Sequence, residues 1–196
     1  EKAEERVLKF TAPKAKILIV DDNEMNLKVA KGLLEPLKMQ IDTAGDGKQA
    51  LDKIQKTTYD MVFMDHMMPE LDGVETTHII RRFHKEYDKV PIIALTANAV
   101  SGTKEMFLRE GMNDFVAKPI QMGEILKCLR RWLPKELLEE VDDEVITETN
   151  DTLEQDKVEE PTIEGIDISD GIMYCGSEKM FYELLGDFYK LIDIKI

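Results

Sequence analysis

Charged and hydroxyl side chains stand at the ends of four short apolar segments. Asp21 and Asp22 follow the run KILIV, and Asp65 ends the run DMVFMD. Thr96 follows PIIAL, and Lys118 follows DFVA. Each residue alone has an ordinary structural role, because an Asp before a helix is often its N-cap and a single Thr or Lys is most often a capping or surface residue. The recurrence of the pattern at four segment ends is what indicates chemistry.

The segments around these residues alternate between predicted strands and predicted helices. The strands are Lys16–Val20, Met39–Ala44, Asp60–Met64, Pro91–Leu95 and Asp114–Ala117. The helices are Asn23–Leu37, Gly47–Gln55, Gly73–His84, Val100–Arg109 and Met122–Trp132. Short apolar strands that alternate with helices are typical of a parallel sheet covered on both faces. Because ligands bind beyond the carboxyl ends of such strands, we expect the polar residues to meet at one edge.

Three carboxylates in one place repel one another unless a cation lies between them. Mg²⁺ is a hard cation that takes oxygen ligands and keeps several waters, so it suits a shallow site of this kind. Lys118 and Thr96 would hold the outer oxygens of a phosphoryl group there. Asp65 would then be the nucleophile that forms an acyl phosphate.

Four stretches of the chain resemble the receiver domain of two-component response regulators. They are ILIVDDNEMN (17–26), YDMVFMDHMMPELDG (59–73), PIIALTANAV (91–100) and GMNDFVAKPI (111–120). The motifs occur in the family's order and spacing, and the resemblance covers roughly residues 14–133. It implies a flavodoxin-like α/β fold, a doubly wound (βα)5 parallel sheet with strand order 2-1-3-4-5.

The resemblance implies that Asp65 is the phosphoacceptor. Asp21 and Asp22 would hold Mg²⁺ together with Asp65 and the backbone carbonyl of Met67. The phosphoryl group would come from a phosphohistidine on a partner protein. The fragment itself would be a phosphoacceptor with at most slow self-dephosphorylation, which leaves open whether to count it as an enzyme.

Three further residues match the family's switch. Thr96 and Phe115 correspond to the switch pair, and Lys118 corresponds to the phosphate-binding lysine. Phosphorylation would draw Thr96 inward, and Phe115 would follow from an exposed to a buried rotamer. This would alter the surface formed by the fourth helix, the fifth strand and the fifth helix.

The charge of the chain is unevenly placed. The 196 residues carry a formal net charge of −14, yet residues 14–134 hold 18 acidic and 18 basic side chains. Residues 135–160 hold 12 acidic and two basic ones. We therefore divide the chain into a linker from an upstream domain (1–13), a receiver domain (14–134), an acidic linker (135–160) and a helical fragment (161–196). The acidity excludes nucleic-acid binding by bulk charge.

The residues of these motifs resemble those of receiver domains fused to hybrid sensor histidine kinases. Residues 161–196 resemble the start of a histidine phosphotransfer domain, cut off before its phosphohistidine. The implied partners are the phosphodonor domain of a histidine kinase and a histidine phosphotransfer domain, with a homodimer through the receiver or the tail helix as a further possibility.

Several smaller expectations concern the remaining residues. We expect helices over Glu1–Phe10 and Lys135–Val145, and a solvated loop position for His66. Cys128 and Cys175 are too few for a disulfide framework, which favours a reducing compartment. No apolar run approaches the length of a membrane span, so we expect a cytoplasmic location and no direct membrane contact, whether or not the parent protein is anchored.

Two other functions fit part of the pattern. A phosphatase of the haloacid-dehalogenase type also uses an aspartyl nucleophile, Mg²⁺, Thr and Lys. That class usually has a second Asp two residues after the nucleophile, where this chain has Met67. A receiver-like binding module that is never phosphorylated is the third alternative, although all the expected site residues are present.

Overall fold

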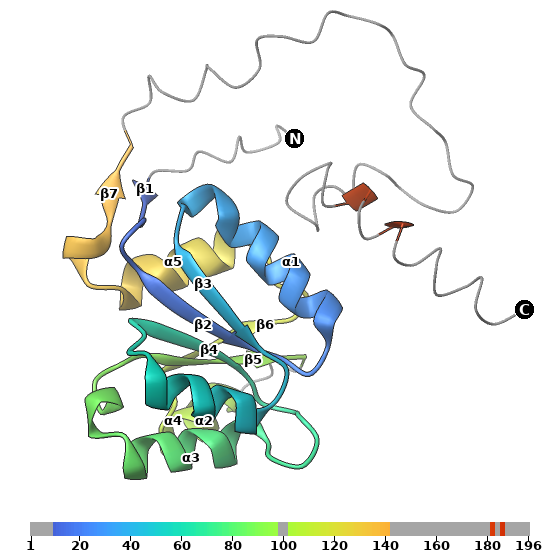
Figure 1. Cartoon of the computed structure of the whole chain (residues 1–196), viewed down its shortest axis with the longest axis vertical. Helices are drawn as coiled ribbons and strands as arrows, with labels where there is room; N and C mark the ends of the chain where they lie inside the picture. Colours follow the sequence, from blue (N-terminus) through green and yellow to red (C-terminus); the bar gives the residue numbers. More distant parts are fainter. Residues whose placement is uncertain (1–9, 98–101, 142–180, 183–184, 187–196) are drawn as a thin grey trace, which may run out of the picture.

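A five-stranded parallel sheet forms the centre of the molecule (Figure 1). The computed structural model describes residues 10–97, 102–141, 181–182 and 185–186. The strands are β2 (Lys16–Val20), β3 (Gln40–Ala44), β4 (Met61–Asp65), β5 (Ile92–Thr96) and β6 (Asp114–Ala117). Their spatial order is β3-β2-β4-β5-β6, with every neighbouring pair parallel. Counted along the chain this is 2-1-3-4-5, which confirms the predicted flavodoxin-like fold.

Helices cover both faces of the sheet, and each face buries its own core. The helices are α1 (Glu24–Leu34), α2 (Gly47–Lys56), α3 (Gly73–Phe83), α4 (Thr103–Arg109) and α5 (Met122–Trp132). Helices α1 and α5 lie on one face, and α2, α3 and α4 lie on the other (Figure 1). Ile17 and Ile19 face the first core, whereas Leu18 and Val20 face the second. The run KILIV lacks polar alternation because both faces of its strand are buried.

The ten elements predicted for the sheet and its helices are present, with small shifts at their ends. Strands β4 and β5 include Asp65 and Thr96 as their last residues. The predicted helix Asn23–Leu37 is divided, because α1 ends at Leu34 and a 3₁₀ turn, η1 (Glu35–Leu37), follows. Pro36 lies in this turn and has no amide proton for a continuing α-helix.

The segments before and after the sheet pair with each other. Strand β1 (Phe10–Thr11) is antiparallel to β7 (Glu139–Glu140), which follows a 3₁₀ turn, η3 (Lys135–Leu137). The predicted helix over Lys135–Val145 is therefore wrong for its described residues, and Phe10 is in a strand instead of a helix. Hydrophobic packing explains the difference, because Leu137 and Leu138 contact the core on the α1–α5 face.

Most of the C-terminal extension lies outside the described residues. This applies to residues 142–180, 183–184 and 187–196, including Cys175, while Cys128 is buried as a free thiol. The division into an acidic linker and a phosphotransfer-like fragment stays a prediction. Among the helices that the structure describes, none has the length and apolar character to cross a bilayer.

Phe10 anchors the paired segments. Its side chain is 1% exposed, and the Arg130 guanidinium lies 5.0 Å from the centre of its ring. The same arginine reaches Glu140 of β7 at 3.5 Å, so one side chain of α5 contacts both β1 and β7. The next residues are fixed as well, because the Ala12 amide donates to the carbonyl of Leu37 at 2.8 Å. We name Phe10–Thr11, Glu139–Glu140 and Arg130 the terminal clasp.

We expect Phe10→Ala to lower the free energy of unfolding by about 3 kcal/mol, because it leaves a cavity in the core where the ring of Phe10 packs. Urea unfolding followed by circular dichroism would measure this. Phe83→Ala is the matched control, since Phe83 is 66% exposed and its truncation should change stability by about 0.5 kcal/mol or less. Equal effects of the two substitutions would contradict the role given to Phe10.

Candidate functional site

Three carboxylates meet at the carboxyl edge of the sheet, as the sequence predicts. Asp21, Asp22 and Asp65 each offer an oxygen atom, and these atoms all lie within 4.8 Å of one another. Asp65 ends β4, and the aspartate pair follows the neighbouring strand β2. Asp21 and Asp65 are buried, whereas Asp22 is exposed. The cluster therefore opens to solvent on the side of Asp22.

Lys118 contacts two of these carboxylates. Its Nζ lies 2.6 Å from Oδ2 of Asp21 and 2.7 Å from Oδ2 of Asp65. Burial would lower the pKa of the Lys118 ammonium, but the two carboxylates outweigh burial and raise this pKa above its ordinary value. The lysine is therefore charged at neutral pH. Its backbone N–H donates to the carbonyl of Thr96 at 2.7 Å, which places β5 and the residue after β6 at the same edge.

Helix α1 fixes the orientation of Asp21. Its Oδ1 accepts hydrogen bonds from the backbone of Asn23 at 3.0 Å and from the Asn26 amide group at 2.9 Å. Asn23, whose side chain accepts from the Met25 amide, is the N-cap of α1, so Asp21 is not the capping residue. Sequence reasoning missed Asn26, although its place in the first turns of a helix that follows the aspartate pair was a usable signal.

The other carboxylate oxygen of Asp21 is incompletely satisfied. Oδ2 is buried and, within the described part of the chain, receives no hydrogen bond of ordinary geometry, so its charge is met by the ion pair with Lys118. Buried carboxylate oxygens are nearly always paired, and an exception at a cluster of like charges needs an explanation. An oxygen of this kind is suited to coordinate a metal ion.

The start of α3 fixes the backbone of Asp65. The Gly73 amide donates to the carbonyl of His66 at 3.2 Å, and the Met67 amide lies 3.3 Å from Oδ1 of Asp65. A β-carbon on Gly73 would lie 2.1 Å from the carbonyl oxygen of Asp65. Only glycine therefore allows α3 to begin this close to the end of β4.

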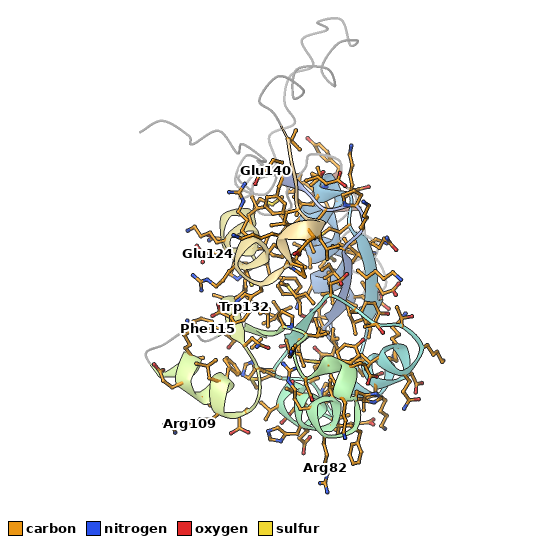
Figure 2. The ribbon with its side chains drawn as sticks, turned by 90° about the vertical axis from the view of Figure 1, so that its left-hand side faces the viewer. Arg82, Arg109, Phe115, Glu124, Trp132 and Glu140 are labelled. Atoms are coloured by element: carbon orange, nitrogen blue, oxygen red, sulfur yellow. The ribbon has the colours of Figure 1, made fainter. Side chains whose placement is uncertain are left out.

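Thr96 and Phe115 lie on neighbouring strands beside the cluster. Thr96 is buried at the end of β5, and Phe115 is half-buried on the edge strand β6. Figure 2 shows Phe115 between the Arg109 end of α4 and Glu124 of α5. A groove of about 680 Å³ on this face is lined by residues that include Lys104, Phe115 and Lys118. The predicted switch residues thus lie between the carboxylates and an open surface.

His66 does not occupy the solvated position that we expected. Its ring is half-buried and meets the ring of Phe107 edge-on, with 5.5 Å between the ring centres. The sequence could not show this contact, because it depends on where α4 lies over the end of β4. Met67, by contrast, is 71% exposed two residues after Asp65.

A family model for the response regulator receiver domain matches residues 17–130. The chain belongs to this family. The match confirms the resemblance found in the sequence, and it covers the five sheet strands except for Lys16, the first residue of β2.

Relatives of this receiver domain include parts of longer kinases. A probable histidine kinase 1 from Oryza sativa subsp. indica is 37% identical over 151 residues, which is 62% of this chain and 16% of that protein. The chain thus spans about a sixth of that curated relative.

Two solved structures show the same fold. The receiver domain of a sensor histidine kinase from Pseudomonas aeruginosa PAO1, with a magnesium ion coordinated in its active site cleft, is 41% identical. The match has a TM-score of 0.55 and covers 60% of this chain and 96% of that one. A co-crystal structure from Saccharomyces cerevisiae, of a histidine phosphotransfer signalling protein with the receiver domain of its downstream response regulator, has 29% identity and a TM-score of 0.60. That match covers 65% of this chain and 94% of that one.

We expect Gly73→Ala to destabilise this receiver domain by about 1–3 kcal/mol, because the new methyl group collides with the backbone of Asp65. Gly123→Ala is the matched control. It is the second residue of α5, and among the described residues no atom beyond its chain neighbours and the backbone of its own helix lies within 4 Å of the added β-carbon, so alanine should leave the stability unchanged or raise it by up to about 0.5 kcal/mol. Thermal unfolding of both variants measures the difference, and two shifts of the same sign would contradict the close approach of α3 to β4.

Proposed function

We propose that this receiver domain accepts a phosphoryl group on Asp65. The observation that carries the proposal is the position of the Lys118 ammonium against Asp21 and Asp65 within a cluster of three carboxylates. In the transfer, a carboxylate oxygen of Asp65 forms a bond to phosphorus while the phosphorus–nitrogen bond of a phosphohistidine breaks. The electron pair of that bond goes to the imidazole nitrogen. The leaving group is a neutral imidazole if its other ring nitrogen carries a proton, and otherwise an imidazolate that takes up a proton from water.

The carboxylates fit a divalent metal ion. The three oxygens lie close together, and the buried Oδ2 of Asp21 lacks a hydrogen bond of ordinary geometry among the described residues. Asp21, Asp22 and Asp65 would hold Mg²⁺ together with the backbone carbonyl of Met67. When bound, Mg²⁺ supplies positive charge that offsets the carboxylates and the incoming phosphoryl oxygens.

Side chains of this chain would hold the transferred group. Lys118 already lies 2.7 Å from Asp65, so its ammonium can exchange that contact for one with a phosphoryl oxygen. The hydroxyl of Thr96, at the end of β5, would donate to another phosphoryl oxygen. Movement of Thr96 would then let Phe115 turn inward and change the α4–β6–α5 face.

The proposed reaction needs a phosphohistidine donor. We infer that the donor is the phosphodonor domain of a histidine kinase and that a histidine phosphotransfer domain is a further partner. The kinship with a histidine kinase and the yeast co-crystal structure support this inference. The cytoplasmic location and the homodimer remain predictions.

A phosphatase would need a general acid beside the nucleophile. Met67 occupies the place two residues after Asp65 and offers no proton. Its side chain is 71% exposed. The missing general acid favours a phosphoacceptor with slow hydrolysis over an efficient phosphatase.

Acetyl phosphate with Mg²⁺ should phosphorylate the wild-type chain once, and Asp65→Asn should abolish the modification because the amide is not a nucleophile. Intact mass spectrometry measures the product. Asp52→Asn makes the same change on the exposed side of α2 and should leave phosphorylation intact. Rapid multiple turnover of phosphate esters would instead support the phosphatase, and absence of any modification would support the binding module.

Asp21→Asn should weaken Mg²⁺ binding by about tenfold or more, which corresponds to about 1.4 kcal/mol or more, because it removes one of the clustered charges. Isothermal titration calorimetry with MgCl₂ measures the affinity, and Asp52→Asn controls for the change in net charge. Equal affinities of these two variants would contradict the proposed ligand role of Asp21.

A further inference from the structure

Three aromatic rings form a row from the acceptor strand to the edge of the sheet. His66 follows Asp65, Phe107 lies in α4, and Phe115 lies in β6. The ring centres of His66 and Phe107 are 5.5 Å apart with an interplanar angle of 77°. Those of Phe107 and Phe115 are 6.4 Å apart with an angle of 39°. The row therefore runs from His66, next to Asp65, through Phe107 of α4 to Phe115.

Hydrogen bonds hold His66 at the end of β4. Its backbone N–H donates to the carbonyl of Leu95 at 3.2 Å, and its Nδ1 lies 3.3 Å from the same oxygen. Its own carbonyl accepts from Gly73 at the start of α3. The imidazole thus contacts Leu95, the residue of β5 immediately before Thr96. A displacement of this end of β5 would move the carbonyl that the ring contacts.

Phe107 is the buried side chain of α4. It is 1% exposed and belongs to the core on the α2–α4 face. Because α4 has only seven residues, this one anchor largely determines where the helix lies on the sheet. The ring of His66 contacts this side chain of α4.

We propose that His66 is a positioning residue that links the state of Asp65 to the position of α4 through its edge contact with Phe107. This coupling through His66 and Phe107 would act in addition to the proposed movement of Thr96 and Phe115. The inference rests on the proposed function, because it assumes that Asp65 changes state. His66 does not take part in the chemistry, so its loss should spare phosphate acceptance.

The test uses the whole chain with Mg²⁺ and beryllofluoride, a phosphoryl mimic. Hydrogen exchange of the α4 amides is measured with and without the mimic, and ¹⁹F NMR reports its occupancy. We expect His66→Ala to reduce the exchange response of α4 at least threefold at equal occupancy. His66→Phe keeps an aromatic edge but no ring nitrogen, so it should retain the response and separate the ring contact from the contact with Leu95.

Phe107→Leu is the second variant, because it keeps an apolar anchor for α4 and removes the partner ring. It should reduce the response as much as His66→Ala, and the double variant should show no further loss. An unchanged α4 response in His66→Ala at full occupancy would overturn the coupling and leave the proposed function intact. Failure of the wild-type chain to bind beryllofluoride would overturn the proposed function, and the coupling with it.

Discussion

Repulsion among three carboxylates held within 4.8 Å is the constraint on which the rest of the site depends. Like charges at this separation push the side chains apart unless the surroundings hold them in place. The sheet supplies rigid strand ends, the N-cap and first turn of α1 supply two donors to Asp21, and Lys118 supplies the opposite charge. The same repulsion makes the cluster sensitive to added charge. A cation or phosphoryl group that entered it would change the forces on the ends of β2, β4 and β6 together.

The positions of the main site residues could be predicted because parallel topology is a strong geometric rule. Asp21, Asp65 and Thr96 follow or end buried apolar runs, and the carboxyl ends of parallel strands share one edge. Lys118 follows β6 at the same edge. No contact needed to be known in advance, since the alternation of strands and helices determines where these side chains meet. The roles of these residues, which come from the motifs, stay predictions.

What could not be predicted depends on contacts between elements distant in the sequence. The pairing of β1 with β7 involves strands of two residues each, too short for any periodicity to be seen. The guanidinium of Arg81 donates to the carbonyls of Gly111, Tyr87 and Val90, although the arginine resembles any charged residue on a helix surface. His66 was misjudged for the same reason, because its burial depends on α4.

The acidic side chains of the terminal clasp do not set the charge at Asp65. The clasp residues Glu139 and Glu140 pair with β1, which precedes the amino end of β2, whereas Asp21 follows its carboxyl end. The five residues of β2 extend about 17 Å, and charges in salt solution are screened over about 8 Å. Acidic side chains at the clasp therefore contribute little potential at Asp65. Lys118, at 2.7 Å and partly shielded from solvent, outweighs them, so the immediate surroundings of Asp65 govern its electrostatic environment more than the clasp does.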